Sequence, residues 1–271
     1  MIKFHRSTRI AAAMACVLAA SGAASDTTET TDAQTALDGR TIIARVDDAN
    51  DSADGRRQAT MLIERGKQKL VRRLAMQNKR YGDDERSLIR FLEPADVRNT
   101  QFLSWTYDEV ARNDDLWVFF PTENLIRRIS GGGKRGSFMR SDFANEDIER
   151  RSVDDDTHDY IETVQLGDRP AYVVESRPVP AKAQDSAYAM RRSWIDTERW
   201  IALQVEYYDR RDRLMKRLSQ GGIEEIDGIW TATKLIMETP RRKSRTLMQY
   251  SEVAYNVGLE DAVFEQATLG R

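Results

Sequence analysis

From residue 57 onward, apolar and polar side chains alternate in short stretches along the chain. Residues 200–208, WIALQVEYY, show the pattern best. Ile201, Leu203 and Val205 fall on one face of an extended strand, and the intervening polar residues fall on the other. The same alternation predicts strands at 59–65, 67–76, 87–92, 115–120, 124–130, 159–166, 170–177, 187–196, 213–219, 229–238 and 244–255.

Short turn sequences separate many of these strands. Asp227-Gly228 lies between two apolar stretches, as a two-residue hairpin turn does. Gly167-Asp168, Gly221-Gly222 and Pro240 predict three more turns. About a dozen strands with few helical patterns between them indicate one meandering antiparallel sheet, which has to curl or close to bury an apolar face. The spacing at 36–46 predicts one short helix before the sheet.

The first 24 residues have the order of a secretory signal peptide. Three basic residues and no acidic ones precede an apolar stretch at 10–20, and small residues follow it. This order predicts export, with cleavage near Ala23 or Ala24. The apolar stretch is shorter than the roughly 20 residues that span a bilayer. Lipid modification of Cys16 is the alternative, but the apolar stretch continues past this cysteine, so we assign Cys16 to the discarded peptide.

Export limits the chemistry that the chain can perform. Without Cys16 the protein has no cysteine, which excludes disulfides, thiolate catalysis and cysteine-ligated metal sites. The exported chain has 39 basic residues against 44 acidic ones, a net charge of −5, because residues 1–24 contain three of the 42 basic residues and no acid. This balance does not favour nucleic-acid binding. We expect a periplasmic monomer without a transmembrane segment, with a flexible leader at 25–35 and one domain at 36–271.

Catalytic groups are sparse in the remaining sequence. The acidic residues at 154–156 lack the spacing and the glycine of a calcium loop. His158 is the only histidine after residue 24, and no G-x-S-x-G sequence offers a nucleophile. We therefore expect no enzymatic activity, no metal and no cofactor. A hydrolase that uses His158 is the remaining enzymatic alternative.

The stretch 131–137, GGGKRGS, has the composition of a phosphate-binding loop but not its order. That loop needs lysine directly before a serine or threonine and a helix after it, whereas Lys134 precedes Arg135. We interpret the stretch either as a solvated hairpin tip or as a basic lip that meets an anionic head group or a partner protein. Residues 141–149 predict a short covering helix with Ser141 as its N-cap.

Large apolar side chains are concentrated between residues 102 and 120. Residues 116–120, LWVFF, are apolar on both faces of the predicted strand. Such a strand is either covered on both sides or has one face that lines a pocket.

Several recognisable stretches follow one another over nearly the whole exported chain: IRFLEPADV at 89–97, LWVFFP at 116–121 with RRI at 127–129, GSFM at 136–139, SDF at 141–143, VEYYD at 205–209, IDGIW at 226–230, and YNVGL at 255–259 with Phe264. In this combination and order the sequence resembles the LolA-like family of outer-membrane lipoprotein-sorting proteins, relatives of the carrier LolA and the receptor LolB. It departs from the family at two positions that often have glycine, where this chain has Arg98-Asn99 and Arg140.

The resemblance implies a mainly β fold, an incomplete and strongly curved antiparallel barrel with a few helices around an apolar cavity. It implies a periplasmic protein that carries acyl chains of lipoproteins or lipids between envelope membranes, with an inner-membrane exporter or an outer-membrane receptor as partner. A lipid-sensing or exporter-docking accessory protein on the same fold is the alternative. The expected cavity residues are Phe102, Trp105, Trp117, Phe119, Ile126, Phe138 and Phe143, and the expected rim or docking residues are Arg127, Arg128, Lys134 and Arg135. The pattern does not fix which face of 116–120 points inward.

Overall fold

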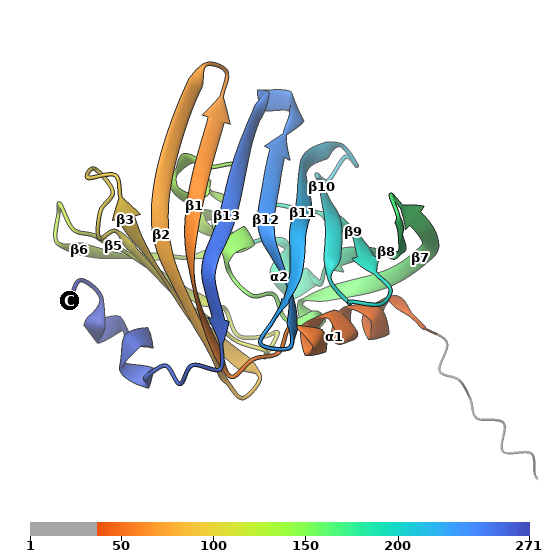
Figure 1. The fold of residues 1–271 in the computed structure, drawn as a ribbon, viewed down its shortest axis with the longest axis horizontal. Helices are drawn as coiled ribbons and strands as arrows, with labels where there is room; N and C mark the ends of the chain where they lie inside the picture. The colour runs from red at the N-terminus through yellow and green to blue at the C-terminus, as the bar shows by residue number, and fades with distance from the viewer. Residues whose placement is uncertain (1–36) are drawn as a thin grey trace, which may run out of the picture. The chain divides into compact units, whose positions relative to one another are not determined.

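One antiparallel sheet of thirteen strands organises residues 37–271, which the computed structural model describes (Figure 1). The expected signal peptide, the leader and Cys16 lie outside these residues. The strands are β1 (Asp54–Arg65), β2 (Gln68–Tyr81), β3 (Asp84–Glu93), β4 (Gln101–Thr106), β5 (Asp115–Phe120), β6 (Leu125–Ile129), β7 (Asp156–Leu166), β8 (Arg169–Pro178), β9 (Met190–Asp196), β10 (Ala202–Tyr208), β11 (Leu214–Ile226), β12 (Ile229–Thr239) and β13 (Ser244–Tyr255).

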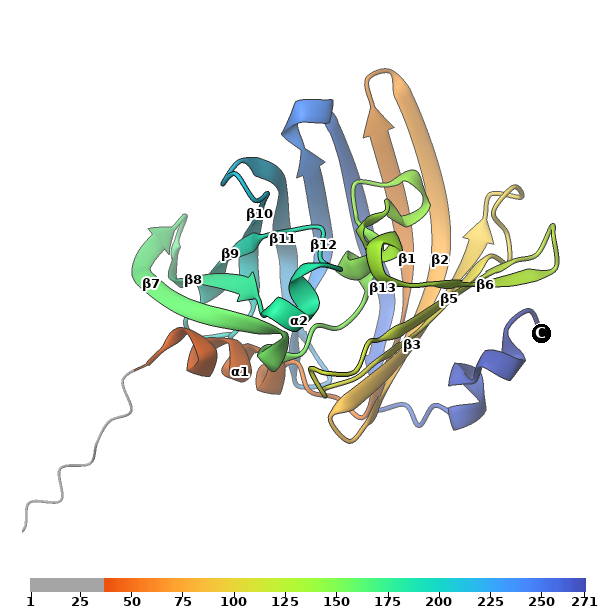
Figure 2. The same cartoon turned by 180° about the vertical axis from the view of Figure 1, so that it is seen from behind.

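The order of the strands leaves two free edges. It runs β6-β5-β4-β3-β2-β1-β13-β12-β11-β10-β9-β8-β7, so the first and last strands pair at the centre of the sheet. β6 and β7 follow each other in the chain but lie at opposite edges, and the curved sheet is not closed between them (Figure 2). Residues 130–155, which we call the inner segment, therefore have to cross from one edge to the other.

Two α-helices and seven 3-10 turns complete the described fold. α1 (Gly39–Ala49) begins after Asp38, whose carboxylate accepts a hydrogen bond from the Thr41 amide at 2.7 Å and caps the helix. Its buried Ile42 packs against Val174 and Ile195 on β8 and β9. The other elements are α2 (Pro180–Ala183), η1 (Gly131–Arg135), η2 (Phe138–Arg140), η3 (Asn145–Ile148), η4 (Val153–Asp155), η5 (Pro240–Arg242), η6 (Asp261–Phe264) and η7 (Gln266–Thr268).

The inner segment fills the concave face of the sheet. Phe138 is completely buried, and its ring centroid lies 5.7 Å from that of Phe91 and 4.9 Å from that of Phe102. Phe143 belongs to the same apolar cluster, which extends across both halves of the sheet to Met237. The main core of the protein therefore lies between the sheet and its own crossover connection.

The C-terminal residues cover part of the opposite, convex face. Trp117 and Phe119 on β5 pack there with Phe264 and Leu269. Leu116 and Val118 belong instead to the concave cluster. β5 is apolar on both faces because both faces are covered. Of the two interpretations of residues 116–120, the structure therefore agrees with a strand that is buried on both sides.

Most of the predicted strands and turns are present, with four differences. The helix expected at 36–46 is α1, which begins and ends about three residues later. β4 was not among the predicted strands, and Gly221-Gly222 lies inside β11 rather than at a turn. Only the single turn η3 forms where a helix was expected at 141–149, and Ala144 rather than Ser141 precedes it. Asp227-Gly228 forms the expected hairpin turn, with φ of 50° and 83° at its two residues.

Asp142 fixes the inner segment to the hairpin of β12 and β13. Its carboxylate accepts hydrogen bonds from the hydroxyls of Thr239, Ser244 and Thr246, at 2.7, 2.5 and 2.8 Å. The Asp142 side chain is buried at 3% exposure, so these hydroxyls replace water around the carboxylate. The Ser-Asp-Phe sequence at 141–143 thus combines a polar anchor with an apolar one.

We predict that Asp142→Ala lowers the free energy of unfolding by about 2–3 kcal/mol, because buried hydroxyls lose their acceptor. Urea denaturation measures the change. Asp142→Asn keeps the shape of the side chain and one acceptor oxygen, so it should lower the free energy of unfolding by less than Asp142→Ala does. Equal losses in the two variants, or no loss in either, would contradict an anchoring role for the carboxylate.

Candidate functional site

A cavity of about 240 Å³ remains between the inner segment and the sheet. Its sheet wall comes from β1, β2, β3, β12 and β13, which are neighbouring strands around the centre of the sheet. Its other wall comes from the inner segment through Phe138, Phe143 and Ile148. The apolar side chains of the sheet wall are Leu74, Met76, Ile89, Leu235, Met248 and Tyr250.

One end of this cavity is polar. Arg57 lies there with its guanidinium carbon 5.0 Å from the ring centre of Tyr250, and it has no ion-pair partner within residues 37–271. Glu85 accepts a hydrogen bond from Asn78 at 3.3 Å, and burial raises its pKa although Arg150 and Arg57 oppose the shift. Arg150 is held by Asp47 of α1 at 2.5 Å. The cavity thus joins an apolar interior to a charged end, as a site for an amphiphilic ligand does.

A buried ion cluster supports the inner segment beside the cavity. Lys134 donates to Asp114 at 2.8 Å and to Glu149 at 2.6 Å. Burial raises the pKa of Glu149 to about 7, although Lys134 favours the charged form. Burial acts to lower the pKa of Lys134, but the two carboxylates outweigh this effect and raise it. The second carboxylate oxygen of Glu149 has no hydrogen-bond partner among the described residues.

The glycines at 131–133 allow Lys134 to enter this cluster. Gly131 has φ of 50°, in the left-handed region that most side chains avoid. A Cβ on Gly133 would lie 2.8 Å from the Ile129 side chain. The glycine-rich stretch is therefore a tight inward turn, η1, with no following α-helix. This geometry agrees with the rejection of a phosphate-binding loop.

The expected cavity residues divide between the two faces of the sheet. Phe138 and Phe143 line the cavity, and Phe102 lies behind Phe138 in the same core. Trp105, Trp117 and Phe119 lie on the convex face, because alternation along β4 and β5 places them under the C-terminal residues. Ile126 on the edge strand β6 is 37% exposed. These last four side chains do not line the concave cavity.

The expected rim residues also have different environments. Arg127 and Arg128 are exposed and pair with Glu123 and Asp115. Arg135 is exposed, but Lys134 is only 9% exposed and faces inward. The charge of Lys134 is therefore not solvated as a hairpin tip would make it, because the carboxylates of Asp114 and Glu149 hold its ammonium group inside the protein.

The only histidine within residues 37–271, His158, has both ring nitrogens in hydrogen-bond contacts. One lies 2.8 Å from the Ser176 hydroxyl and the other 2.8 Å from the Val153 carbonyl oxygen. A serine, an imidazole and a backbone carbonyl do not make up a serine-histidine-acid triad. No cluster of metal-ligating side chains occurs among residues 37–271.

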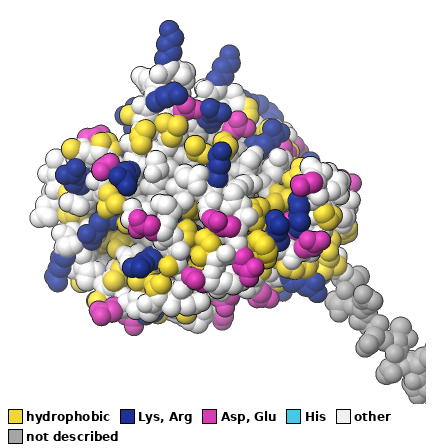
Figure 3. Space-filling model, in the orientation of Figure 1, with side chains coloured by type: hydrophobic (Ala, Val, Ile, Leu, Met, Phe, Trp, Pro, Cys, Tyr) yellow, Lys and Arg dark blue, Asp and Glu magenta, His cyan; other side chains and the backbone are white. Residues whose placement is uncertain are grey.

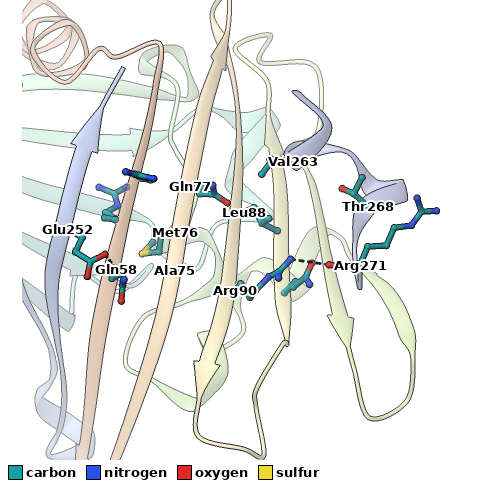
Figure 4. A pocket seen from close by; sticks show the side chains of 13 residues that line it. Gln58, Ala75, Met76, Gln77, Leu88, Arg90, Glu252, Val263, Thr268 and Arg271 are labelled. Carbon is teal, nitrogen blue, oxygen red and sulfur yellow. Dashed lines mark hydrogen bonds between the residues drawn. The ribbon is translucent and has the colours of Figure 1, made fainter. Parts of the chain in front are cut away.

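A second, wider groove of about 570 Å³ lies on the convex face, beside the C-terminal residues (Figure 4). Arg90 donates a hydrogen bond to the carbonyl of Arg271 at 3.3 Å across this groove. Gln58 and Gln77 add amides, and few apolar side chains line it. Nine of the thirteen residues that line the groove are polar or charged, whereas apolar side chains face each other across the concave cavity, so we take the concave cavity as the candidate site.

Comparisons with solved structures identify relatives of the fold. A DUF1329 family protein from Desulfovibrio piger matches with a TM-score of 0.82 and 39% identity, over 85% of this chain and 97% of the other. A domain assigned to outer-membrane lipoprotein sorting, from Vibrio parahaemolyticus, matches with a TM-score of 0.81 and 25% identity, over 86% and 98% of the two chains. A LolA superfamily protein from Nitrosomonas europaea has a TM-score of 0.69 at 20% identity, over 86% and 99%, which shows the fold alone.

The open, curved antiparallel sheet is therefore a LolA-like fold. The chain belongs to the DUF1329 family, as its 39% identity over most of both chains shows. A family model described as an uncharacterized protein matches residues 83–271. No curated protein matches the sequence. No helix within residues 37–271 has the length and hydropathy of a membrane span.

Glu149 should make stability depend on pH. Its folded pKa of about 7 exceeds the ordinary value of 4.5, so the folded state binds more protons between these values. Its contribution to stability therefore falls as the pH rises from about 4.5 to about 7.

We predict that Glu149→Gln removes this fall. Urea unfolding at about pH 5 and about pH 8 should show wild type losing stability relative to the variant at the higher pH. The exposed Glu260→Gln serves as the control and should follow wild type. A constant difference between wild type and Glu149→Gln at both pH values would show that Glu149 does not titrate in this range.

Proposed function

We propose that the protein is a periplasmic binding protein that holds an acyl chain of a lipid or lipoprotein in the concave cavity and carries it between envelope membranes. The observation that supports this most is the cavity itself, apolar along the sheet and charged at the end that holds Arg57. An acyl chain would lie against the apolar wall, with its head group toward Arg57 and Arg150. Each buried methylene would contribute about 0.8 kcal/mol to binding.

The inner segment would act as the cover of the site. It supplies Phe138, Phe143 and Ile148 to the cavity wall, so moving the segment enlarges the cavity directly. At about 240 Å³ the cavity is below the roughly 300–1,000 Å³ of most ligand pockets. A cargo with more than one acyl chain would bind only to a state in which the segment has moved.

Further features of the proposal come from the sequence and from the relatives. Export would remove residues 1–24, and residues 36–271 would form the working domain. The relative from Vibrio parahaemolyticus, whose assignment is outer-membrane lipoprotein sorting, supports a role in the envelope. The protein would bind rather than catalyse, and an inner-membrane exporter or an outer-membrane receptor would load or unload it.

The small volume of the cavity also favours the second candidate, an accessory protein that senses lipid or docks on an exporter without delivering cargo. The two functions differ in what happens after binding. A carrier passes a bound fluorescent acyl probe to a partner or an acceptor membrane. A sensor keeps the probe and changes its affinity for a partner protein.

We predict that Leu235→Asp weakens binding of a fluorescent acyl probe by about tenfold or more, because it places a charge in the apolar wall. Leu235 and Ile236 are neighbours on β12, and both are half-buried. Leu235 pairs with Met248 on the concave face, whereas Ile236 pairs with Leu247 on the convex face. Ile236→Asp is therefore a matched control that should keep wild-type affinity.

Fluorescence titration measures both variants, and circular dichroism confirms that each is folded. Wild-type affinity in a folded Leu235→Asp would place the probe outside the concave cavity. Equal weakening by the two substitutions would mean that a disturbed fold, and not the charge in the cavity wall, weakens binding of the probe.

A further inference from the structure

Two neighbouring hairpin tips form a basic surface at one end of the central strands of the sheet. Because β1 pairs with β13, with Arg65 opposite Ser244, the β1–β2 tip lies beside the β12–β13 tip. The two hairpins rise together at the top of Figure 1, and basic side chains project from them in Figure 3. The exposed cations of these tips are Arg65, Lys67, Lys69, Arg73, Arg241, Arg242, Lys243 and Arg245.

Few of these cations are neutralised within the protein. Lys69 and Arg245 share one carboxylate, Glu64, at 2.9 and 2.6 Å. Arg73 lies 3.8 Å from Glu93. The other five have no ion-pair partner within residues 37–271, and they are Arg65, Lys67, Arg241, Arg242 and Lys243.

The basic tips contrast with the rest of the chain. The net charge of the sequence is −2, so cations are concentrated here against an acidic background. Successive hairpin turns alternate between the two ends of the strands. At the other end, the β2–β3 turn carries Asp83 and Asp84, and the β11–β12 turn has Glu224, Glu225 and Asp227 beside it. Such a separation of charge orients a protein in front of a negatively charged surface.

Two exposed apolar side chains accompany the cations. Leu70 is 40% exposed and Val71 is 54% exposed, directly after Lys69 on β2. They point to opposite faces of the sheet, because Leu70 pairs with Ile63 and Val71 with Leu62. The tip is therefore apolar on both sides and surrounded by flexible cations, a combination that suits the boundary between head groups and acyl chains.

We propose that these two tips dock the protein on an anionic phospholipid surface, with Leu70 and Val71 entering the head-group layer. The cations fit lipid phosphates, and each would contribute about a fivefold gain in affinity near such a surface. An acidic protein would match the cations but would need a pocket for a projecting apolar tip. A membrane accepts a projecting tip at any point of its surface.

The same hairpins hold the cover of the cavity. Thr239 and Ser244, which bind Asp142 of the inner segment, flank the basic turn at 240–243. Arg72, next to Val71, donates a hydrogen bond to the Met139 carbonyl oxygen of the inner segment. Docking would thus place the membrane beside the anchors of the inner segment. The docking itself needs no acyl cargo and goes beyond the proposed carrier function.

Co-sedimentation with vesicles tests the docking surface. One set of vesicles contains phosphatidylcholine alone, and the other contains equal parts of phosphatidylcholine and phosphatidylglycerol. We predict binding to the second set only, weakening as salt is added because exposed charges are screened. The triple variant Arg241→Glu, Arg242→Glu, Lys243→Glu should bind about 100-fold more weakly or worse.

A matched control makes the same charge change elsewhere. Arg45, Arg56 and Lys234 are exposed cations away from the two tips, and replacing all three with Glu should leave most of the binding intact. A fluorophore at Val71→Cys, in a chain that also carries Cys16→Ser, should shift to the blue on anionic vesicles. The same fluorophore at Lys234→Cys should not.

Three results would overturn the proposal. They are equal binding to both vesicle types, equal loss in the tip and control triple variants, and binding to an acidic protein partner without binding to anionic vesicles. None of these results depends on whether the cavity holds an acyl chain, so the proposed carrier function stands or falls separately.

Discussion

The whole arrangement depends on the need to bury the concave face of an open thirteen-strand sheet. Pairing β1 with β13 leaves β6 and β7 as edges, although they are consecutive in the chain. The connection between them therefore crosses the concave face, and its aromatic side chains supply the apolar area that the sheet lacks. The cavity is the space that this crossover does not fill. The inner segment therefore both covers the candidate site and forms one of its walls.

Polar interactions decide where that crossover lies. Asp142 fixes it to the β12–β13 hairpin, and Lys134 with Asp114 and Glu149 fixes it near β5. Both sets of side chains are buried. Separating the partners would leave buried polar groups without hydrogen bonds, which costs more free energy than the same separation at the surface. In the proposed carrier, loading and release would require a second arrangement of the inner segment in which these contacts are broken.

The sequence was sufficient to predict the class of fold and most of its strands, because alternation and turn residues act locally. It was not sufficient to predict which face of 116–120 points inward. That depends on what covers each side, and the C-terminal residues that cover Trp117 are far away in the chain. Gly221-Gly222 has turn composition, but its neighbours pair with β12 and keep the strand continuous. Lys134 looked like a surface cation because its two carboxylate partners meet only in the fold. The cavity wall residues, such as Leu235 and Met248, carry no local signal beyond the alternation of their strands.

The central claim is that the concave cavity binds an acyl chain, and native mass spectrometry tests it most directly. The protein would be expressed with export to a bacterial periplasm, purified without detergent and weighed intact, and any bound mass would be identified after solvent extraction. The account predicts an additional mass that is released as phospholipid or acylated peptide. A protein that carries no additional mass, and that also takes up no added acyl probe, would contradict it and would make the concave cavity ordinary core.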